Sequence, residues 1–379
     1  MRVQLGCSLG GEGHLVPLAN VAKAFERAGH EVVVLVPPAL APSVQQTGLD
    51  YRVGDEPSRA FVDGIWERVR QGPPDAVAGL IDRELFAERC TEAMLPAARE
   101  LRAAWRPDLV VREPCEYASA VVAHESGLPQ AQVGISLAAL ESNVLGMVAP
   151  IIDRFLPGLA AAIGSAPYLS AFPDSLDPSP WPDTRRFRPT QVPSDSSVDW
   201  ISAGDEPLIY VTFGTVLGHL AEAVGVYRCA LDAIAGLPAR VLMTVGRTTE
   251  VADLGSIPDN ARVEQWVPQH AILPRAALVV CHGGSGTTMG ALATGVPLVM
   301  CPLFADQPRN AKAIERAGAG VVLPSGQGAL RSLGPEHVAP LRASIERVLG
   351  DPAYRRAAEQ IAAEIAGMPT LDELVERLL

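Results

Sequence analysis

The sequence feature that most constrains the fold is an alternation of strand, glycine-rich turn and helix near the start of the chain. An apolar run over residues 3–8 is followed by three glycines within residues 10–13. Apolar residues then recur at helical spacing over 15–25, and a second apolar strand covers 31–36. This order opens a parallel βαβ unit and therefore predicts an α/β domain. It returns as strand, helix and strand over residues 108–111, 117–126 and 130–134.

The same alternation restarts in the second half of the chain. Further strands are predicted over residues 208–213, 241–245, 278–281, 297–301 and 320–323. We therefore expect a second α/β domain that is separate from the first, with helices from about residue 335 to the end.

The two halves are joined by a stretch that is typical of a linker. Residues 173–205 are rich in Pro, Ser and Asp. A length of 379 residues also fits two domains, since one domain averages about 150 residues. We expect a first domain over 1–190, a linker over 191–205 and a second domain over 206–379, whose last helix can pack back on the first domain.

Two less regular stretches are predicted within the first half, over residues 57–96 and 137–180. Their large apolar side chains suit the wall of a pocket for a lipophilic molecule. Four of these side chains are candidate acceptor contacts: Phe61, Trp66, Phe86 and Met147.

Charge and composition exclude several classes of protein. With 43 acidic against 31 basic residues, the net charge of -12 opposes binding to a phosphate backbone, so nucleic acid is not an expected partner. No run approaches the roughly 20 uncharged apolar residues of a membrane span, and the N-terminus predicts a strand rather than a signal peptide. We expect a cytoplasmic protein. The six cysteines form no CxxC pair and are expected to be reduced thiols.

The first glycine loop does not match a dinucleotide-binding motif. A GxGxxG pattern fails in both registers, at Glu12 or at Val16, and prolines stand where a ribose-binding acid belongs. The loop does place His14 in the first turn of a helix, where the helix dipole favours a neutral imidazole. His14 is therefore a candidate general base, although a histidine in a helix cap is also often structural.

Glu113 is the second candidate, because it follows the predicted strand over residues 108–111. Strand ends of a parallel sheet meet at one edge, so Glu113 and His14 are able to meet. A carboxylate on one imidazole nitrogen would orient the ring and raise the basicity of the other nitrogen. The alternatives, that Glu113 caps the following helix or pairs with an arginine, stay open.

A third candidate site begins where the strand over residues 278–281 ends. The sequence that follows, 282–288, is a glycine-rich turn into a helix, with hydroxyl donors at Ser285 and Thr287. Such a turn presents unpaired N–H groups to an anion, which favours phosphate binding. The chain has no GxxxxGK[ST], which excludes a P-loop NTPase. Nearby, Trp266 offers a face for a base, while Asp306 and Gln307 suit sugar hydroxyls.

Taken together, these motifs resemble the family 1 glycosyltransferases, which have the two-domain GT-B fold and use nucleotide sugars. The resemblance covers residues 10–17, 107–113, 210–215, 266–269, 282–288 and 306–307. It is greatest to the actinomycete branch that modifies antibiotics and other aromatic or macrocyclic natural products. It implies an α/β protein with two Rossmann-like domains whose parallel sheets face a central cleft.

The resemblance also implies roles for single residues. His14 is the base that deprotonates the acceptor, and Glu113 replaces the aspartate that usually orients it. Trp266, Val267 and Gln269 lie at the donor base. The diphosphate and the sugar are held by the remaining predicted donor residues: Thr215, His282, Gly284, Ser285, Gly286, Thr287, Asp306 and Gln307.

One departure from the family concerns the donor. UDP-sugar users commonly carry a glutamate for the ribose hydroxyls eight residues after the loop histidine, where this chain has Gly290. We therefore expect a TDP-deoxysugar, transferred with inversion and without a metal, since no Asp-x-Asp motif is present. A UDP-sugar transferase, a sugar-nucleotide 2-epimerase of the same fold and a catalytically silent helper are the alternatives. Bond formation at oxygen or carbon, and homodimer formation, stay open.

Overall fold

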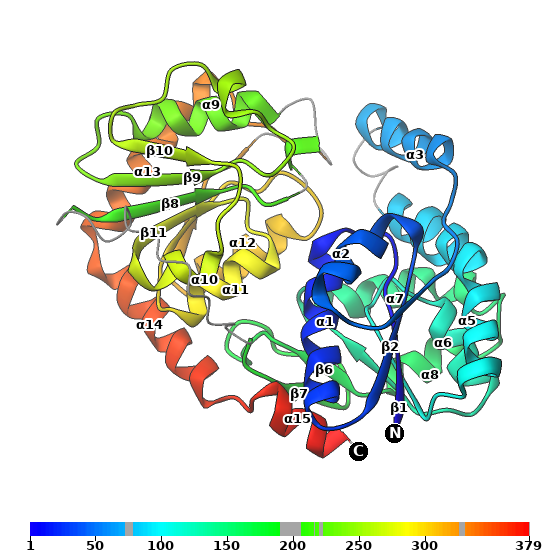
Figure 1. Cartoon of the computed structure of the whole chain (residues 1–379). Helices are drawn as coiled ribbons and strands as arrows, with labels where there is room; N and C mark the ends of the chain where they lie inside the picture. The colour runs from blue at the N-terminus through cyan, green and yellow to red at the C-terminus, as the bar shows by residue number, and fades with distance from the viewer. Residues whose placement is uncertain (73–78, 190–205, 216, 220–222, 326–329, 379) are drawn as a thin grey trace. The chain divides into compact units, whose positions relative to one another are not determined.

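The structure is a computed structural model that describes residues 1–72, 79–189, 206–215, 217–219, 223–325 and 330–378 (Figure 1). The predicted linker over residues 191–205 lies outside the described residues. The chain divides into two compact units, one of residues 1–190 with 368–379 and one of residues 191–367. The last twelve residues of the predicted second domain thus belong to the first unit.

The first unit is built on a parallel sheet in the order β3-β2-β1-β4-β5-β6-β7. The central strands β1 and β4 pair so that Gly6 lies opposite Arg112, and their carboxyl ends are therefore level. The strands are β1 (Arg2–Gly6), β2 (Glu31–Val36), β3 (Tyr51–Val53), β4 (Leu109–Arg112), β5 (Gln130–Val133), β6 (Tyr168–Ser170) and β7 (Thr184–Arg186).

Helices cover both faces of this sheet, which explains why its inner strands β2 and β4 are runs of valine and leucine. On one face α1, α2 and α15 pack against the strands, and on the other face η2, α5, α6, α7 and α8 do so (Figure 1). The helices are α1 (Glu12–Arg27), η1 (Pro38–Leu40), α2 (Ala41–Thr47), α3 (Arg59–Gln71), η2 (Ile81–Cys90), α5 (Thr91–Trp105), α6 (Ala118–Glu125), α7 (Ala138–Ile152), α8 (Leu159–Ser165) and α15 (Leu371–Leu378).

The two stretches predicted to be less regular, 57–96 and 137–180, are mainly helical, and that prediction was wrong. Proline usually ends a helix, which made these segments resemble loops. Pro96 and Pro150 nevertheless lie inside α5 and α7. The helix η2 is wound as a π-helix of ten residues, a rare form that is frequent at functional sites.

The second unit has its own parallel sheet, in the order β10-β9-β8-β11-β12-β13. Its strands are β8 (Leu208–Thr212), β9 (Arg240–Thr244), β10 (Ala261–Glu264), β11 (Ala276–Cys281), β12 (Leu298–Met300) and β13 (Gly320–Val322). Its helices are η4 (Leu217–His219), α9 (Ala223–Ile234), η5 (Val251–Leu254), α10 (Gln269–Ile272), η6 (Leu273–Arg275), α11 (Ser285–Ala293), α12 (Gln307–Arg316), η7 (Pro335–His337), α13 (Val338–Gly350) and α14 (Pro352–Gly367). Two Rossmann-like units of parallel strands and helices confirm the predicted α/β fold class.

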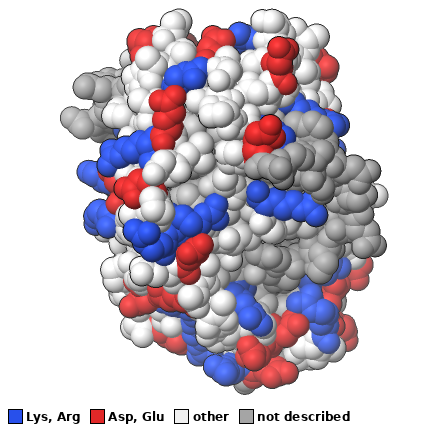
Figure 2. All heavy atoms as spheres, turned by 90° about the vertical axis from the view of Figure 1, so that its left-hand side faces the viewer, with Lys and Arg blue, Asp and Glu red and all other residues white. Residues whose placement is uncertain are grey.

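The described residues also show how charge is distributed on the surface and in what state the cysteines are. On the face drawn in Figure 2, basic and acidic side chains of the described residues alternate in small groups. No described helix is both long enough and apolar enough to span a bilayer. All six cysteines are free thiols, and only Cys115 is not fully buried.

Candidate active site

The first group of predicted site residues meets at the carboxyl ends of β1 and β4. His14 lies in the first turn of α1, after the loop that leaves β1, and Glu113 directly follows β4. The backbone N–H of Glu113 donates to the Gly6 carbonyl at 3.1 Å, which continues the pairing of the two strands. The structure places Nδ1 of His14 3.2 Å from Oε2 of Glu113. The two residues that the sequence left as separate candidates are therefore partners.

Glu113 is fully buried, so protein groups rather than water must satisfy its charge. Its Oε1 accepts the Ser8 backbone N–H at 2.9 Å, and its Oε2 accepts the Cys115 backbone N–H at 2.7 Å. Burial raises the pKa of Glu113, but His14 and these hydrogen bonds outweigh burial, so that its pKa is below the ordinary value. An ionised Glu113 would keep a proton on Nδ1 of His14 and leave the lone pair on Nε2.

The loop that carries Glu113 is fixed by a buried arginine. The Arg112 guanidinium donates to the backbone carbonyls of Glu113 at 3.0 Å and Glu116 at 3.1 Å, and to Gln132 at 2.6 Å. Within the part of the chain that the structure describes, the side-chain partner of the Glu113 carboxylate is His14 and not an arginine. Instead, the arginine next to it holds the backbone on which Glu113 stands.

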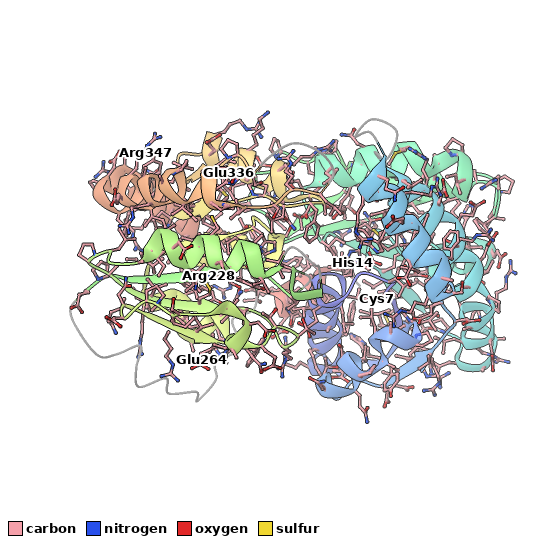
Figure 3. All side chains as sticks on the ribbon, turned by 90° about the horizontal axis from the view of Figure 1, so that it is seen from above. Cys7, His14, Arg228, Glu264, Glu336 and Arg347 are labelled. Atoms are coloured by element: carbon pink, nitrogen blue, oxygen red, sulfur yellow. The ribbon has the colours of Figure 1, made fainter. Side chains whose placement is uncertain are left out.

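The His14 ring also packs against Gly10 and Phe86. A Cβ built on Gly10 would lie 2.3 Å from Cγ and Cδ2 of His14, so only glycine leaves room for the ring at this position. The ring of Phe86, on the π-helix η2, lies 5.7 Å from the His14 ring between centroids. Figure 3 labels His14 together with Cys7, the residue that directly follows β1. Its side chain stays 18% exposed, which is enough for one ring nitrogen to reach a substrate.

In the second unit, the predicted phosphate loop lies between β11 and α11. Gly283 has φ of 85° and turns the chain between β11 and α11. The loop therefore ends at the N–H groups of the first turn of α11. The His282 ring fills the space that two glycines leave open. A Cβ on Gly284 would lie 2.3 Å from Nε2 of His282, and one on Gly214 would lie 2.8 Å from it. The exposed Thr215 follows Gly214 in the turn after β8.

His282 is neutral at physiological pH. Burial lowers the pKa of His282 to about 4, and Asp306 and the backbone of Thr212 oppose this shift only in part. A neutral imidazole contributes one N–H donor rather than a positive charge. The loop therefore offers an anion a set of N–H and hydroxyl donors: the amides around Gly284 and Gly286, the hydroxyl of Thr287, and this ring.

Asn310 is a site residue that the sequence analysis missed. Its Nδ2 lies 2.8 Å from Oδ2 of Asp306, 3.0 Å from Oγ of Ser285 and 3.1 Å from the Gly283 carbonyl. Ser285 also donates to Asp306 at 2.9 Å. The buried Asn310 thus joins the predicted phosphate loop to the predicted sugar-binding acid. Its position four residues after Asp306, on the same face of α12, was the available signal.

The other predicted donor residues follow the carboxyl ends of β10 and β12. Gln269 donates to the Thr287 hydroxyl at 3.1 Å, so the segment after β10 reaches the phosphate loop. Trp266 is 50% exposed, and the Arg247 guanidinium lies 5.0 Å from the centre of its ring. The neighbouring Val267 is partly buried.

Gln307 lies at the start of α12 and is almost fully buried. Its Oε1 accepts the backbone N–H groups of Leu303 at 2.8 Å and Phe304 at 3.1 Å. Its amide oxygen therefore fixes the loop after β12, and a contact with a sugar would fall to its amide nitrogen. Ala305, next to Asp306, has φ of 53°, a left-handed conformation that is uncommon outside glycine.

Comparison with known proteins identifies the family. The second part of the chain, residues 228–379, matches the family model "Erythromycin biosynthesis protein CIII-like, C-terminal domain", and residues 79–150 match the corresponding N-terminal domain. The chain is 33% identical over 390 residues to the L-demethylnoviosyl transferase of Streptomyces niveus, covering 100% of the chain and 97% of that protein. The chain belongs to this family of glycosyltransferases.

Two further similarities of this glycosyltransferase concern named donors. It is 28% identical over 421 residues to the TDP-daunosamine transferase DnrS of Streptomyces peucetius, covering 97% of the chain and 95% of that protein. The solved structure of the spinosyn rhamnosyltransferase SpnG, complexed with thymidine diphosphate, is similar with a TM-score of 0.80 at 25% identity, and covers 100% of both chains.

Three of the four predicted acceptor residues of the glycosyltransferase belong to η2 or contact it. Phe86 belongs to η2 and contacts His14, while Met147 of α7 accepts from Arg83 of η2 at 3.2 Å. The centre of the Phe61 ring, on α3, lies 5.4 Å from the guanidinium carbon of Arg89, which is also on η2. Trp66 is partly buried on α3, two turns along that helix. All four therefore stay candidates for the acceptor side.

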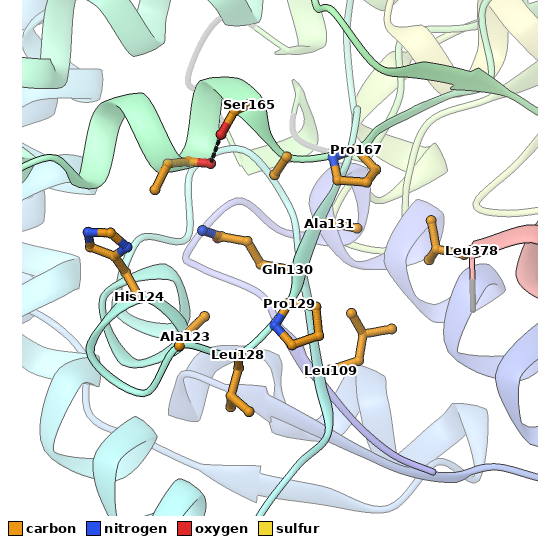
Figure 4. Close-up of a pocket in the computed structure, with 13 residues that line it drawn as sticks. Leu109, Ala123, His124, Leu128, Pro129, Gln130, Ala131, Ser165, Pro167 and Leu378 are labelled. Atoms are coloured by element: carbon orange, nitrogen blue, oxygen red, sulfur yellow. Dashed lines mark hydrogen bonds between the residues drawn. The ribbon is translucent and has the colours of Figure 1, made fainter.

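A separate pocket of about 350 Å³ lies elsewhere in the first unit (Figure 4). It is lined by residues at the amino ends of β4 and β5, such as Leu109 and Gln130, together with His124, Ser165 and Leu378. Because Glu113 lies at the carboxyl end of β4, this pocket is at the opposite edge of the sheet. It contains none of the predicted acceptor residues.

Proposed function

We propose that this glycosyltransferase moves a deoxysugar from a TDP-sugar to a hydroxyl of a lipophilic natural product, with inversion at the anomeric carbon. Acceptors of the aromatic polyketide, enediyne or macrolide type fit the apolar side chains around η2. The observation that carries the proposal is the contact between His14 and Glu113, because it is the arrangement of a general base with its orienting carboxylate.

The first unit supplies the base. Nε2 of His14 takes the proton of the acceptor hydroxyl while the oxygen attacks the anomeric carbon. Glu113, held by two backbone N–H groups, receives the Nδ1–H hydrogen bond and stabilises the imidazolium that forms. Single displacement by one attacking oxygen inverts the configuration at that carbon.

The second unit receives the leaving diphosphate. Preorganised donors aimed at developing negative charge lower the barrier without reorganisation. In this proposal the N–H groups of the loop after β11, the neutral His282 and the hydroxyl of Thr287 are such donors. The Ser285 hydroxyl and Asn310 donate to Asp306, which would hold sugar hydroxyls. These groups make a metal unnecessary in the proposed mechanism, and EDTA should leave transfer intact.

The thymidine donor is supported by two observations. The relative DnrS is named for a TDP-sugar, and SpnG was solved with thymidine diphosphate. In this chain Gly290 stands on α11, and a Cβ there would lie 3.9 Å from Oε1 of Gln269, a predicted contact of the base. A glycine at this position gives a ribose 2'-hydroxyl no carboxylate acceptor.

The experiment that tests the proposal is product analysis with the purified chain alone. TDP-deoxysugars are combined with aromatic and macrocyclic aglycones, products are weighed by mass spectrometry, and the anomeric configuration is assigned by NMR. We expect a glycoside with the anomeric configuration opposite to that of the donor. Epimerised donor without an acceptor product would favour the epimerase, and transfer only after addition of a second protein would favour the helper.

A further inference from the structure

The side chains around the base include a group that nothing in the proposed reaction uses. One ligand atom from each of His14, Glu113 and Cys115 lies within 4.8 Å of the other two. The backbone N–H of Cys115 donates to Glu113, but its thiol has no role in proton transfer. Imidazole, carboxylate and thiol together are the ligand types that zinc prefers.

From this arrangement we propose that His14, Glu113 and Cys115 form a binding site for a thiophilic divalent cation of the Zn²⁺ class, and that the bound cation switches the base off. The inhibitory effect rests on the proposed function of His14, whereas binding of the cation does not.

The distances fit a tetrahedral ion. Zinc lies about 2.0–2.1 Å from an imidazole nitrogen, about 2.0–2.2 Å from a carboxylate oxygen and about 2.3 Å from a thiolate, so neighbouring ligand atoms are about 3.3–3.6 Å apart. Nδ1 of His14 and Oε2 of Glu113 already lie 3.2 Å apart. A bound cation takes the place of the proton between these atoms, and the Cys115 sulfur, within 4.8 Å of both, closes toward them by about 1.2 Å at most. Water completes the four ligands.

The surroundings of Cys115 are negatively charged. Cys115 is partly buried, and the carboxylates of Glu113 and Asp82 act on its thiol. The same negative charges attract a divalent ion. The thiol proton leaves to solvent as the sulfur binds, so the thiolate and the Glu113 carboxylate together offset the two positive charges of the ion.

Binding at Nδ1 has a direct chemical consequence for catalysis. In the active tautomer Nδ1 carries the proton and Nε2 carries the lone pair. A cation needs the Nδ1 lone pair, so the ring proton moves to Nε2 and no lone pair is left to accept a proton from the acceptor hydroxyl. The cation also takes the Glu113 oxygen that orients the ring. Inhibition should therefore lower kcat and leave TDP affinity in the second unit unchanged.

The test uses the full-length chain, first freed of metal with EDTA and then titrated with Zn²⁺ or Co²⁺. We expect one equivalent of Zn²⁺ to abolish transfer, and excess EDTA to restore it. With Co²⁺, a sulfur-to-cobalt charge-transfer band should appear. Loss of a group that merely orients a metal ligand costs about 10–100-fold in affinity, so Cys115→Ser should raise the half-inhibiting Zn²⁺ concentration by at least about tenfold and remove the band.

Cys90→Ser is the matched control, since Cys90 is a buried thiol of the first unit outside the cluster. Cys115→Ala repeats the test if the serine variant is unstable, and each variant is compared with its own rate in EDTA. Equal Zn²⁺ sensitivity of wild type and both Cys115 variants, or no sulfur-to-cobalt band, would overturn the proposal. A band that disappears in Cys115→Ser while saturating Zn²⁺ leaves transfer intact would confirm the cation site and refute His14 as the base.

Discussion

In the first unit the candidate chemistry depends on two side chains, His14 and Glu113, whereas in the second unit it depends on a main-chain loop around His282. Glu113 is ionised because a histidine and two N–H groups face it, while His282 is neutral because burial outweighs the one acid near it. One substitution is enough to remove the catalytic function of a pair of side chains. A loop of many donors should lose affinity for the diphosphate in smaller steps, and the predictions below follow that difference.

The largest effect is expected for Gly10→Ala. Its Cβ would lie 2.3 Å from the His14 ring, so the ring must leave its position against Glu113. Because a general base contributes about 10²–10⁴-fold, transfer should fall by roughly 10²-fold or more while TDP affinity, measured by calorimetry, stays unchanged. Gly13→Ala is the control, since a Cβ there meets nothing within 4 Å. Equal rates for the two variants would show that ring position does not matter.

A smaller effect is expected for His282→Ala in the second unit. Removing one donor to a charged group costs about 1.5–3 kcal/mol, so TDP affinity should fall roughly 10- to 100-fold while the loop amides keep part of the binding. His337→Ala, in η7 of the same unit, serves as the control. Unchanged TDP affinity in His282→Ala would remove this ring from the donor site.

Donor selectivity sharpens the comparison within the second unit. Native protein should prefer TDP over UDP by roughly tenfold or more, because a buried ribose hydroxyl without an acceptor costs about 1–3 kcal/mol. Gly290→Glu should shift that preference toward UDP. Its Cβ would lie 2.9 Å from the end of the Leu273 side chain, which can rotate away. Gly290→Ala makes the same contact without the carboxylate, and competition binding that gives both variants the same ratio would contradict the prediction.

Another buried glutamate in the first unit shows what the histidine contributes. Glu141 accepts the N–H groups of Ile135 at 2.8 Å and Ser136 at 2.7 Å, and burial raises its pKa to about 8. In the unfolded chain the pKa of a glutamate is about 4.3, so above that pH the folded protein holds a proton that the unfolded chain has released. The free energy of unfolding therefore falls as pH rises toward 8.

Glu141→Gln removes that loss and keeps an oxygen for both N–H groups. Relative to wild type, the variant should gain at least about 1.4 kcal/mol of unfolding free energy, the value of one pKa unit, between pH 5 and pH 8. Denaturant unfolding at the two pH values measures it. A difference between wild type and variant that is constant with pH would show that Glu141 is ionised throughout.

The parts of the molecule that could be predicted are those in which a regular pattern of apolar residues has one physical cause, burial of a strand on both faces. Strands such as β2 and β11 are buried on both faces and were found from their apolar runs, and the edge of the sheet where His14 and Glu113 meet follows from parallel pairing. The strands β3, β6, β7 and β10 were missed because they are short and, unlike the equally short β12 and β13, contain polar or charged residues in place of an apolar run. Asn310 contacts Ser285 and the Gly283 carbonyl across 25 and 27 residues of sequence, and no local pattern displays such contacts.

The contact of His14 with Glu113 makes one measurement decisive: turnover and TDP affinity of His14→Ala, taken on the same preparation with a TDP-sugar and an accepted aglycone. If His14 is the base, turnover falls by roughly 10²-fold or more, and the dissociation constant for TDP stays that of the native protein. Turnover close to the native value, with the same TDP affinity, would contradict the assignment of His14 as the base.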